Sequence, residues 1–212
     1  MSTAQGITYR AAAPDDVTLL TRMLWVAFNW RDEAVSEQHW PDPTAAAKYV
    51  DGFGRHGDAG VVAAVAGQDV GAAWYRLLPA DDPGYGFVAA DIPEITLGVA
   101  AQARGRGIGR MLMQRLLDRA VADRIAALSL SVEPDNAAVR LYLALGFERV
   151  GGSDHAAADP RAGRESRCVI GCSTSRPLGT GTGRTRVERR CSSRQQRQRR
   201  SRAEAIAPRR SR

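Results

Sequence analysis

The chain has 212 residues, enough for one ordinary domain with a hydrophobic core and some length to spare. It holds only 3 Cys, no recognisable signal peptide and no apolar stretch long enough to cross a bilayer, which argues against secretion and against a membrane protein. Its formal net charge of +7 lies in the C-terminal part, because residues 1–151 hold 14 basic against 18 acidic residues whereas residues 152–212 hold 16 against 5. We therefore expect a cytoplasmic protein.

Apolar periodicity in residues 1–151 predicts alternating strands and helices. Short apolar runs indicate strands, and apolar residues that recur every three or four positions indicate helices with one buried face. In chain order, the predicted elements are a strand at Ile7–Ala12, a helix from Val17 to about Trp30, a helix from after Thr44 through Tyr49, a hairpin of Val61–Ala66 and Val70–Leu78, a strand at Glu94–Val99, a helix from Gly109 to about Asp123, a strand at Ala127–Val132, a helix at Asn136–Leu145 and a strand at Phe147–Val150. This order is typical of an α/β domain with a partly parallel sheet.

A glycine-rich turn follows the strand Glu94–Val99 and runs directly into the next helix. It reads Arg104-Gly-Arg-Gly-Ile-Gly109, and its glycines let the backbone approach a ligand closely. The helix that follows presents unpaired N–H groups and the positive end of its dipole. The turn therefore predicts a cradle for a phosphate group, with Arg104 and Arg106 adding positive charge at its rim.

Two other phosphate-binding turns do not fit this stretch. A P-loop requires Gly-Lys-Ser/Thr, and the turn contains no lysine. A dinucleotide-binding fingerprint requires a glycine at its sixth position, which is Arg110 when counted from Gly105, and it belongs to the first strand–helix unit of a domain. A plain glycine-rich connection stays open as the structural alternative.

A second motif lies about 30 residues further along, between the next strand and the next helix. It reads Glu133-Pro-Asp-Asn136, followed by Ala137-Ala-Val-Arg-Leu-Tyr142-Leu-Ala-Leu-Gly-Phe147. Asp135 or Asn136 is a plausible N-cap of that helix, and Gly146 a plausible C-cap.

The two motifs, in this order, resemble the signatures of the GNAT superfamily of N-acetyltransferases over roughly residues 5–151. The family's coenzyme A motif is Arg/Gln-x-x-Gly-x-Gly/Ala at a helix start, which Arg104, Gly107 and Gly109 match; Gln102, Gly105 and Gly107 match its short form, so the register is open on this motif alone. The second motif is similar to the family's Asn-x-x-Ala/Val-x-x-Leu-Tyr-x-x-x-Gly-Phe.

This resemblance implies an α/β fold with a mixed, mostly antiparallel sheet, flanked by helices, whose fourth and fifth strands splay apart. Acetyl-coenzyme A would be the co-substrate, with its pantetheine arm between those strands. Backbone groups near Leu97 and Val99 would bond the pantetheine and thioester, and Asn136 would lie beside the arm. The implied pyrophosphate cradle comprises Arg104, Gly105, Arg106, Gly107, Ile108 and Gly109.

The implied reaction is direct attack of a primary amine on the acetyl thioester in a ternary complex. Such an amine has a pKa of about 10.4, so its neutral form is disfavoured by roughly 4–5 kcal/mol at neutral pH and a general base is useful. Glu94 stands where many family members place a base that acts through water. A strand-edge carboxylate that faces solvent is the alternative interpretation of Glu94, and both stay open.

The departing thiolate, with a pKa of about 8.5 by analogy with cysteine, benefits from a proton donor. The resemblance assigns that role to Tyr142. A packing role is the alternative, because Val139 lies three residues before Tyr142 and Leu141 and Leu145 form the adjacent apolar stripe. We favour the catalytic role because the tyrosine falls within the motif.

The acceptor, a small molecule or a peptide, is not identified by the sequence. The resemblance places its site over the first two helices and the hairpin. Aromatic residues and one histidine gather there and in the loop that follows, and each aromatic residue is by itself more often a core residue than part of a ligand pocket: Trp25, Phe28, Trp30, His39, Trp40, Trp74, Tyr75, Tyr85 and Phe87. No metal site is expected, because His39 and His56 lack companions at metal-ligand spacing and Cys168 and Cys172 are wrongly spaced for a zinc knuckle. Dimers are common in the family, so a homodimer is a further expectation.

The pattern changes after Gly151. We expect an acetyltransferase domain over residues 1–151, with a last strand extending to about residue 172, although the candidate at Ser166–Cys172 is poor in apolar residues. Residues 173–212 are predicted to be a disordered, Arg-rich tail. Such a tail can bind nucleic acid through its charge, but it lacks aromatic residues for stacking, so a solvated extension is favoured. An inactive coenzyme A-binding module or a nucleic-acid-binding module is the alternative function.

Overall fold

A computed structural model of the chain describes residues 6–31, 43–152 and 168–173. The strands are β1 (Ile7–Ala11), β2 (Ala59–Val65), β3 (Gln68–Arg76), β4 (Glu94–Val99), β5 (Ala127–Val132), β6 (Glu148–Gly152) and β7 (Cys168–Ser173). The helices are α1 (Val17–Phe28), α2 (Pro43–Val50), α3 (Ile108–Ala122) and α4 (Ala138–Ala144), with short 3-10 turns at Pro14–Asp16 and Ala101–Ala103. The predicted elements of the first 151 residues are therefore all present, and their ends shift by no more than two residues.

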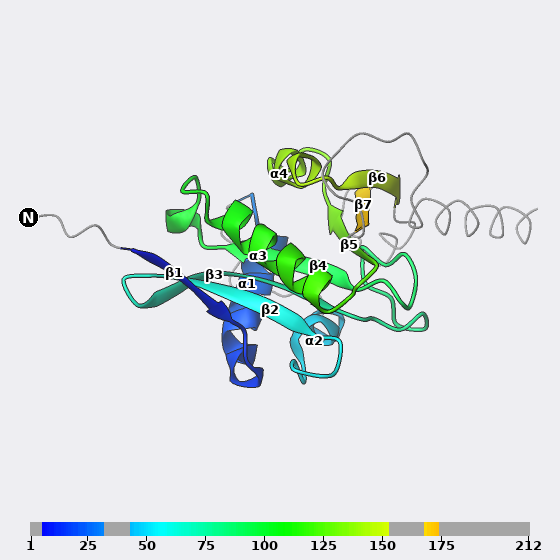
Figure 1. The fold of residues 1–212 in the computed structure, drawn as a ribbon, viewed down its shortest axis with the longest axis horizontal. Helices are drawn as coiled ribbons and strands as arrows, with labels where there is room; N and C mark the ends of the chain where they lie inside the picture. The colour runs from blue at the N-terminus through cyan, green and yellow to red at the C-terminus, as the bar shows by residue number, and fades with distance from the viewer. Residues whose placement is uncertain (1–5, 32–42, 153–167, 174–212) are drawn as a thin grey trace, which may run out of the picture.

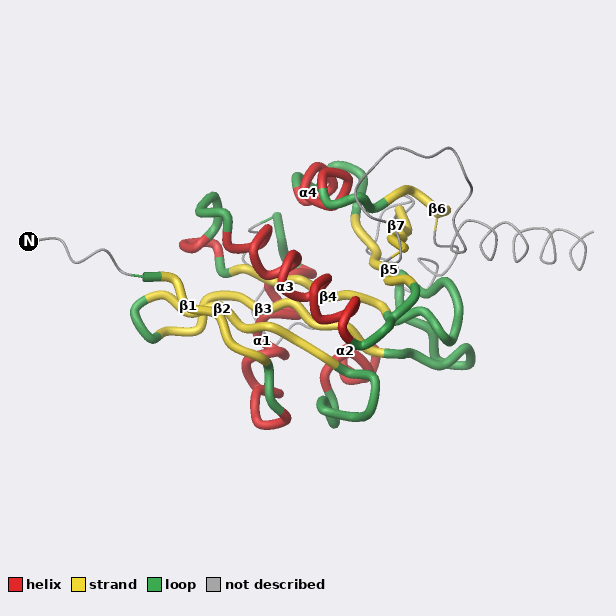
Figure 2. The backbone as a smooth tube through the Cα atoms, viewed as in Figure 1, coloured by secondary structure: helices red, strands yellow, loops and turns green. Residues whose placement is uncertain are grey.

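The strands form one sheet in the order β1-β2-β3-β4-β5-β7-β6 (Figures 1 and 2). The first four pair with their chain neighbours in antiparallel fashion, and β7 pairs antiparallel with both β5 and β6. Only β4 and β5 pair in parallel among the described strands. The sheet is thus mixed and mostly antiparallel, as the resemblance implied, and the candidate closing strand of the sequence analysis is β7.

Helices cover both faces of the first four strands, with α3 on one side and α1 and α2 on the other (Figure 1). Ala63 and Tyr75 pack into the core below α3, whereas Val62 and Trp74 pack into the core below α1 and α2. Because alternate residues of β2 and β3 are buried on opposite faces, these strands read as continuous apolar runs.

The strands β4 and β5 diverge from a single pairing point. Glu94 lies opposite Ser129, and the N–H of Ser129 donates to the carbonyl of Pro93 at 3.0 Å. Beyond that point α1 lies against β4 so closely at Gly98 that a Cβ there would collide with the carbonyl oxygen of Met23. Because β4 and β5 pair only at Glu94 and Ser129, a wedge lies between the two strands and opens toward their carboxyl ends.

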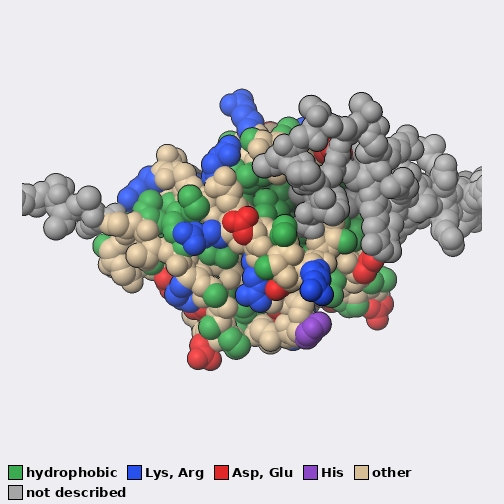
Figure 3. All heavy atoms as spheres, in the orientation of Figure 1, with side chains coloured by type: hydrophobic (Ala, Val, Ile, Leu, Met, Phe, Trp, Pro, Cys, Tyr) green, Lys and Arg blue, Asp and Glu red, His purple; other side chains and the backbone are tan. Residues whose placement is uncertain are grey.

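The described surface carries charges of both signs. On the face seen in Figure 3, Lys and Arg side chains are interspersed with acidic, hydrophobic and other residues rather than gathered in one patch. Within the described part of the chain, no helix is both long enough and apolar enough to cross a bilayer.

Candidate active site

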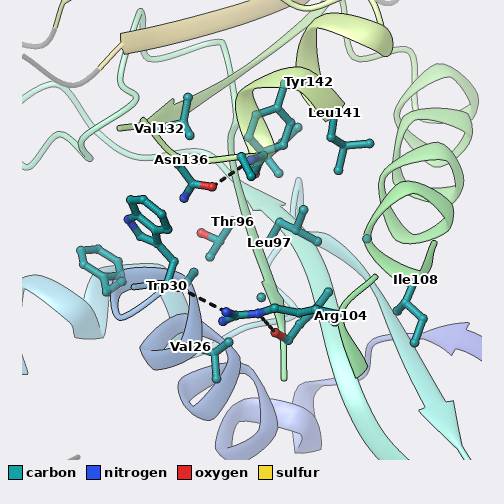
Figure 4. Close-up of a pocket in the computed structure, with 18 of the residues that line it drawn as sticks. Val26, Trp30, Thr96, Leu97, Arg104, Ile108, Val132, Asn136, Leu141 and Tyr142 are labelled. Atoms are coloured by element: carbon teal, nitrogen blue, oxygen red, sulfur yellow. Dashed lines mark hydrogen bonds between the residues drawn. The ribbon is translucent and has the colours of Figure 1, made fainter. Parts of the chain in front are cut away.

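The wedge between β4 and β5 opens into a cavity of about 680 Å³. Its walls come from the end of α1, the strand β4, the turn before α3, the end of β5 and the start of α4 (Figure 4). It brings together ten of the eleven residues that the sequence assigned to the site: Glu94, Leu97, Val99, Arg104, Gly105, Gly107, Ile108, Gly109, Asn136 and Tyr142. The exception is Arg106, whose side chain is exposed and does not line the cavity.

The turn before α3 is built on two glycines with left-handed backbone angles. Gly105 has φ 73° and Gly107, the N-cap of α3, has φ 78°, a region that side-chain-bearing residues rarely adopt. A Cβ at either position would meet no protein atom within 4 Å, and Ile108 anchors the helix start in the core at 1% exposure. Open space beside the first N–H groups of a 15-residue helix fits an anionic phosphate.

The side chain of Arg104 spans the floor of the cavity. Its Nε donates to the carbonyl of Val99 at 3.0 Å, and its Nη1 donates to the carbonyl of Trp30 at 3.2 Å (Figure 4). Arg104 therefore joins the end of β4 to the end of α1. Arg104 lines the cavity and is itself exposed, so its positive charge lies at the open surface of the cavity.

The opposite wall carries Ser131 of β5 and Asn136, which lies just before α4. The Oδ1 of Asn136 accepts the N–H of Ala138 at 2.9 Å, which supports the first turn of α4 (Figure 4). The Oγ of Ser131 is buried and has no hydrogen-bond partner within the described residues, so it is an available polar contact for a ligand. The sequence analysis did not single out Ser131, because one serine in an alternating strand carries no distinguishing signal.

Tyr142 lies on α4 with its side chain buried at 7% exposure. Its ring stands 5.9 Å from that of Phe147, so it packs in the core, and the residue also lines the cavity. Burial raises the pKa of Tyr142 above its ordinary value of 10.0. The phenol therefore keeps its proton throughout the physiological range, and its position suits both packing and proton donation.

Glu94 is buried at the narrow end of the wedge, with 5% exposure. Its Oε1 accepts the N–H of Gly86 at 2.8 Å and the hydroxyl of Tyr49 at 3.3 Å. The alternative of a carboxylate that faces solvent is therefore wrong. The contributions of Tyr49 and Gly86 were missed by the sequence analysis. Tyr49 lies 45 residues before Glu94 in the chain and Gly86 lies 8 residues before it, so no local pattern links either to the carboxylate.

A polar bridge crosses the wedge from the end of α1 to the loop after β5. The indole N–H of Trp30 donates to Glu133 at 3.1 Å, and Arg31 pairs with Glu133 at 3.0 Å and with Asp135 at 2.8 Å. Arg31 holds the pKa of the Asp135 carboxyl below its usual value, chiefly through their hydrogen bond. The partners lie about a hundred positions apart, which is why no local pattern indicated the bridge.

The aromatic residues expected around the acceptor do not all reach the cavity, and Trp25 and Phe87 are half-buried residues outside its lining. Phe28, Trp30 and Tyr85 line the cavity, whereas Trp74 and Tyr75 are core residues with 0% and 1% exposure. Two further expected positions, His39 and Trp40, lie outside the described residues. Among residues 6–31, 43–152 and 168–173, no three His, Cys, Asp or Glu side chains gather as metal ligands would.

Three proteins illustrate what the chain is similar to. It is 49% identical over 57 residues to the N-alpha-acetyltransferase RimI of Mycobacterium tuberculosis, which covers 26% of this chain and 34% of that protein. It is 47% identical over 66 residues to the mycothiol acetyltransferase of Kineococcus radiotolerans, covering 31% and 22% respectively. The matches thus span about a third or less of these curated relatives. The crystal structure of the ribosomal-protein-alanine N-acetyltransferase from Brucella melitensis superposes with a TM-score of 0.57 at 26% identity, over 78% of this chain and 99% of that one.

A family model matches more than half of the chain. The model describes the acetyltransferase (GNAT) family, and it matches residues 20–147. This range includes most of α1, the wedge, the glycine turn, α3 and α4. The chain therefore belongs to the GNAT acetyltransferase family.

Proposed function

We propose that the chain is an N-acetyltransferase that moves the acetyl group of acetyl-coenzyme A to a primary amine by direct attack in a ternary complex. The observation that carries this proposal is one cavity with a phosphate cradle and a buried carboxylate at opposite ends of β4. The six residues of this strand separate the two by roughly 17 Å along the chain. That spacing suits a long, extended arm with a reactive group at its far end.

Acetyl-coenzyme A fits the residues of the cavity. Gly105 and Gly107 leave room for a phosphate beside the start of α3, and Leu97, Val99 and Asn136 line the path from there toward Glu94. Bound in this way, the co-substrate supplies an activated acetyl thioester. The chain itself holds and aligns it through the splayed edge of β4 and the start of α4.

Glu94 is the proposed base for the acceptor. The attacking amine must lose a proton, and Glu94 is a buried carboxylate in the cavity wall beside Phe28, Tyr49 and Tyr85. A carboxylate held in this position can accept the proton directly or through one water. Tyr142, which keeps its proton because burial raises its pKa, is the proposed donor for the departing thiolate.

The α-amine at the N-terminus of a peptide is the acceptor that the relatives favour. The partial match to an N-alpha-acetyltransferase and the 26% identical ribosomal-protein-alanine N-acetyltransferase both carry such an activity in their names. An α-amine has a pKa of about 7.7–8.0, so its deprotonation near neutral pH costs about 1 kcal/mol, far less than for a lysine side chain.

Thiol release from acetyl-coenzyme A tests the activity and the acceptor together. We expect release with peptides that carry a free N-terminus, and none with N-terminally blocked peptides that contain lysine. Turnover of small amines but of no peptide would contradict the assignment of a peptide acceptor. Binding of acetyl-coenzyme A without turnover on any amine would favour the inactive binding module instead.

Gly107→Ala tests the phosphate cradle. Its methyl group would enter the open space at the start of α3, and we expect KM for acetyl-coenzyme A to rise roughly ten-fold, equal to about 1.4 kcal/mol. Gly67→Ala is the matched control, because Gly67 also has positive φ (80°) and no atom within 4 Å of an added Cβ but lies in the β2–β3 turn. An equal rise of KM in both variants would refute the cradle.

Glu94→Gln tests the base. We expect kcat/KM at neutral pH to fall by roughly ten-fold with an α-amine acceptor, because only about a tenth of such an amine is neutral there without a base. Activity should recover as the pH approaches the pKa of the amine, since the neutral acceptor then forms without help. Glu148→Gln, which alters an exposed carboxyl of β6, should leave the whole profile unchanged. Full activity of Glu94→Gln at neutral pH would rule out this role.

Tyr142→Phe tests the proton donor. The change keeps the ring that packs against Phe147, so we expect the melting temperature and the affinity for acetyl-coenzyme A to change little. The turnover number kcat should fall by about 100-fold, because the departing thiolate loses its donor. Intact turnover would leave Tyr142 with a packing role only.

A further inference from the structure

Tyr49 lies in the last turn of α2, and its side chain reaches the proposed base. Its side chain is buried, with 3% of its surface exposed, and it lines the cavity. Its hydroxyl donates to Oε1 of Glu94 at 3.3 Å and accepts the N–H of Tyr85 at 2.8 Å. One phenol thus connects three separate segments: α2, the loop before β4, and the first residue of β4.

The loop before β4 encloses the carboxylate from the other side. The N–H of Gly86 donates to the same Oε1 of Glu94 at 2.8 Å. A Cβ at Gly84 would collide with the Glu94 carboxylate, and a Cβ at Gly86 would come within 2.6 Å of the backbone at Leu130. The two glycines therefore let the loop pass close enough to Glu94 for its backbone to bond the carboxylate.

Two side chains of β3 hold the last turn of α2 against the sheet. The indole N–H of Trp74 donates to the carbonyl of Tyr49 at 2.9 Å. The guanidinium of Arg76 donates to the carbonyls of Lys48 and Asp51 at 3.1 and 3.0 Å. Trp74 is buried at 0% exposure and Arg76 at 1%. Their hydrogen bonds hold the backbone at and around Tyr49, and this backbone sets where the Tyr49 ring begins.

From this arrangement we propose that Tyr49 is a positioning residue: its hydroxyl holds the Glu94 carboxylate in its ionised form and in the orientation that meets the acceptor amine. Through Tyr85 it also fixes the aromatic wall that Phe28 completes, where the Phe28 and Tyr85 rings stand 5.6 Å apart. The inference rests on the role of Glu94 proposed above.

Tyr49 can act as a donor at every working pH. Burial and, secondarily, the negative charge of Glu94 raise the pKa of Tyr49 well above its ordinary value of 10.0. The 3.3 Å separation is long for a hydrogen bond to a carboxylate. Catalytic contacts are often long before substrate binds and shorten in the complex.

Other charged groups near Glu94 are tied to partners of their own. Arg76 lies directly opposite Glu94 on β3, and it pairs with Asp58 at 3.0 Å. Lys48 of α2 pairs with Asp82 of the loop. On β5 the neighbour of Glu94 is the uncharged Ser129. Removing only the Tyr49 hydroxyl leaves all of these in place.

The test compares the pH profiles of kcat/KM for Tyr49→Phe and Tyr75→Phe. Tyr75 is the matched control, because its hydroxyl also donates to a carboxylate, Asp123 at 2.8 Å, but on the α3 side of the sheet. For Tyr49→Phe we expect the acidic limb to move to higher pH by about one unit, since the carboxylate loses a donor. For Tyr75→Phe the limb should stay in place. In Glu94→Gln, adding Tyr49→Phe should shift nothing further.

The outcomes separate this inference from the proposed function. If the pH profile of kcat/KM for Tyr49→Phe equals that of the unmodified protein while Glu94→Gln loses activity, the role of Tyr49 is overturned and the role of Glu94 as base stands. Full activity of Glu94→Gln overturns the base, and the inference with it. If Tyr49→Phe fails to fold, 3-fluorotyrosine at position 49 provides a second test: this stronger donor should move the acidic limb to lower pH, and an unmoved limb would contradict the proposal.

Discussion

β4 and β5 lie side by side in the sheet, yet they pair at one point only, where Glu94 faces Ser129. Parallel neighbours ordinarily exchange hydrogen bonds along their length, so the backbone edges beyond this point must find other partners. Helix α1 covers β4 from one side, and α4 follows β5 on the other. The divergence therefore creates a cavity with polar backbone edges in the middle of a sheet that is otherwise continuously paired. The remaining features of the site are arranged around this cavity.

The chemistry of the cavity follows from the direction of β4. Its first residue is the buried carboxylate at the closed end of the wedge, and its last residue leads into the glycine turn at the open end. One short strand thus sets the distance between the proposed phosphate cradle and the proposed base. Arg104 and the Trp30–Glu133 bridge connect α1 to both walls, so the width of the wedge depends on contacts distant from the pairing point.

The sequence allowed prediction of what depends on neighbours in the chain. Apolar periodicity located the α-helices and β-strands described in the first 151 residues, though not the short 3-10 turns. The glycines of the turn indicated an anion site because their backbone angles are a local property. The contacts of Glu94 were not predictable in this way. Tyr49 and Gly86 meet it only after α2 and the loop fold over β4, and nothing in the pattern around either residue distinguishes it from ordinary core or loop. The burial of Trp74 and Tyr75, compared with the cavity position of Tyr85, likewise depends on which helices cover each face.

The two buried tyrosines of the cavity bear on the two opposite proton transfers that are proposed for this site. Burial raises the pKa of both Tyr49 and Tyr142, but only for Tyr49 does the nearby charge of Glu94 contribute. Both phenols therefore keep their protons at neutral pH, where an ordinary carboxylate is ionised, so the proposed base and the proposed donors can coexist there. Because the Tyr142 phenol holds its proton, the two proposed proton transfers need no exchange between Tyr142 and Glu94: the carboxylate acts on the acceptor amine, and the phenol acts on the departing thiolate.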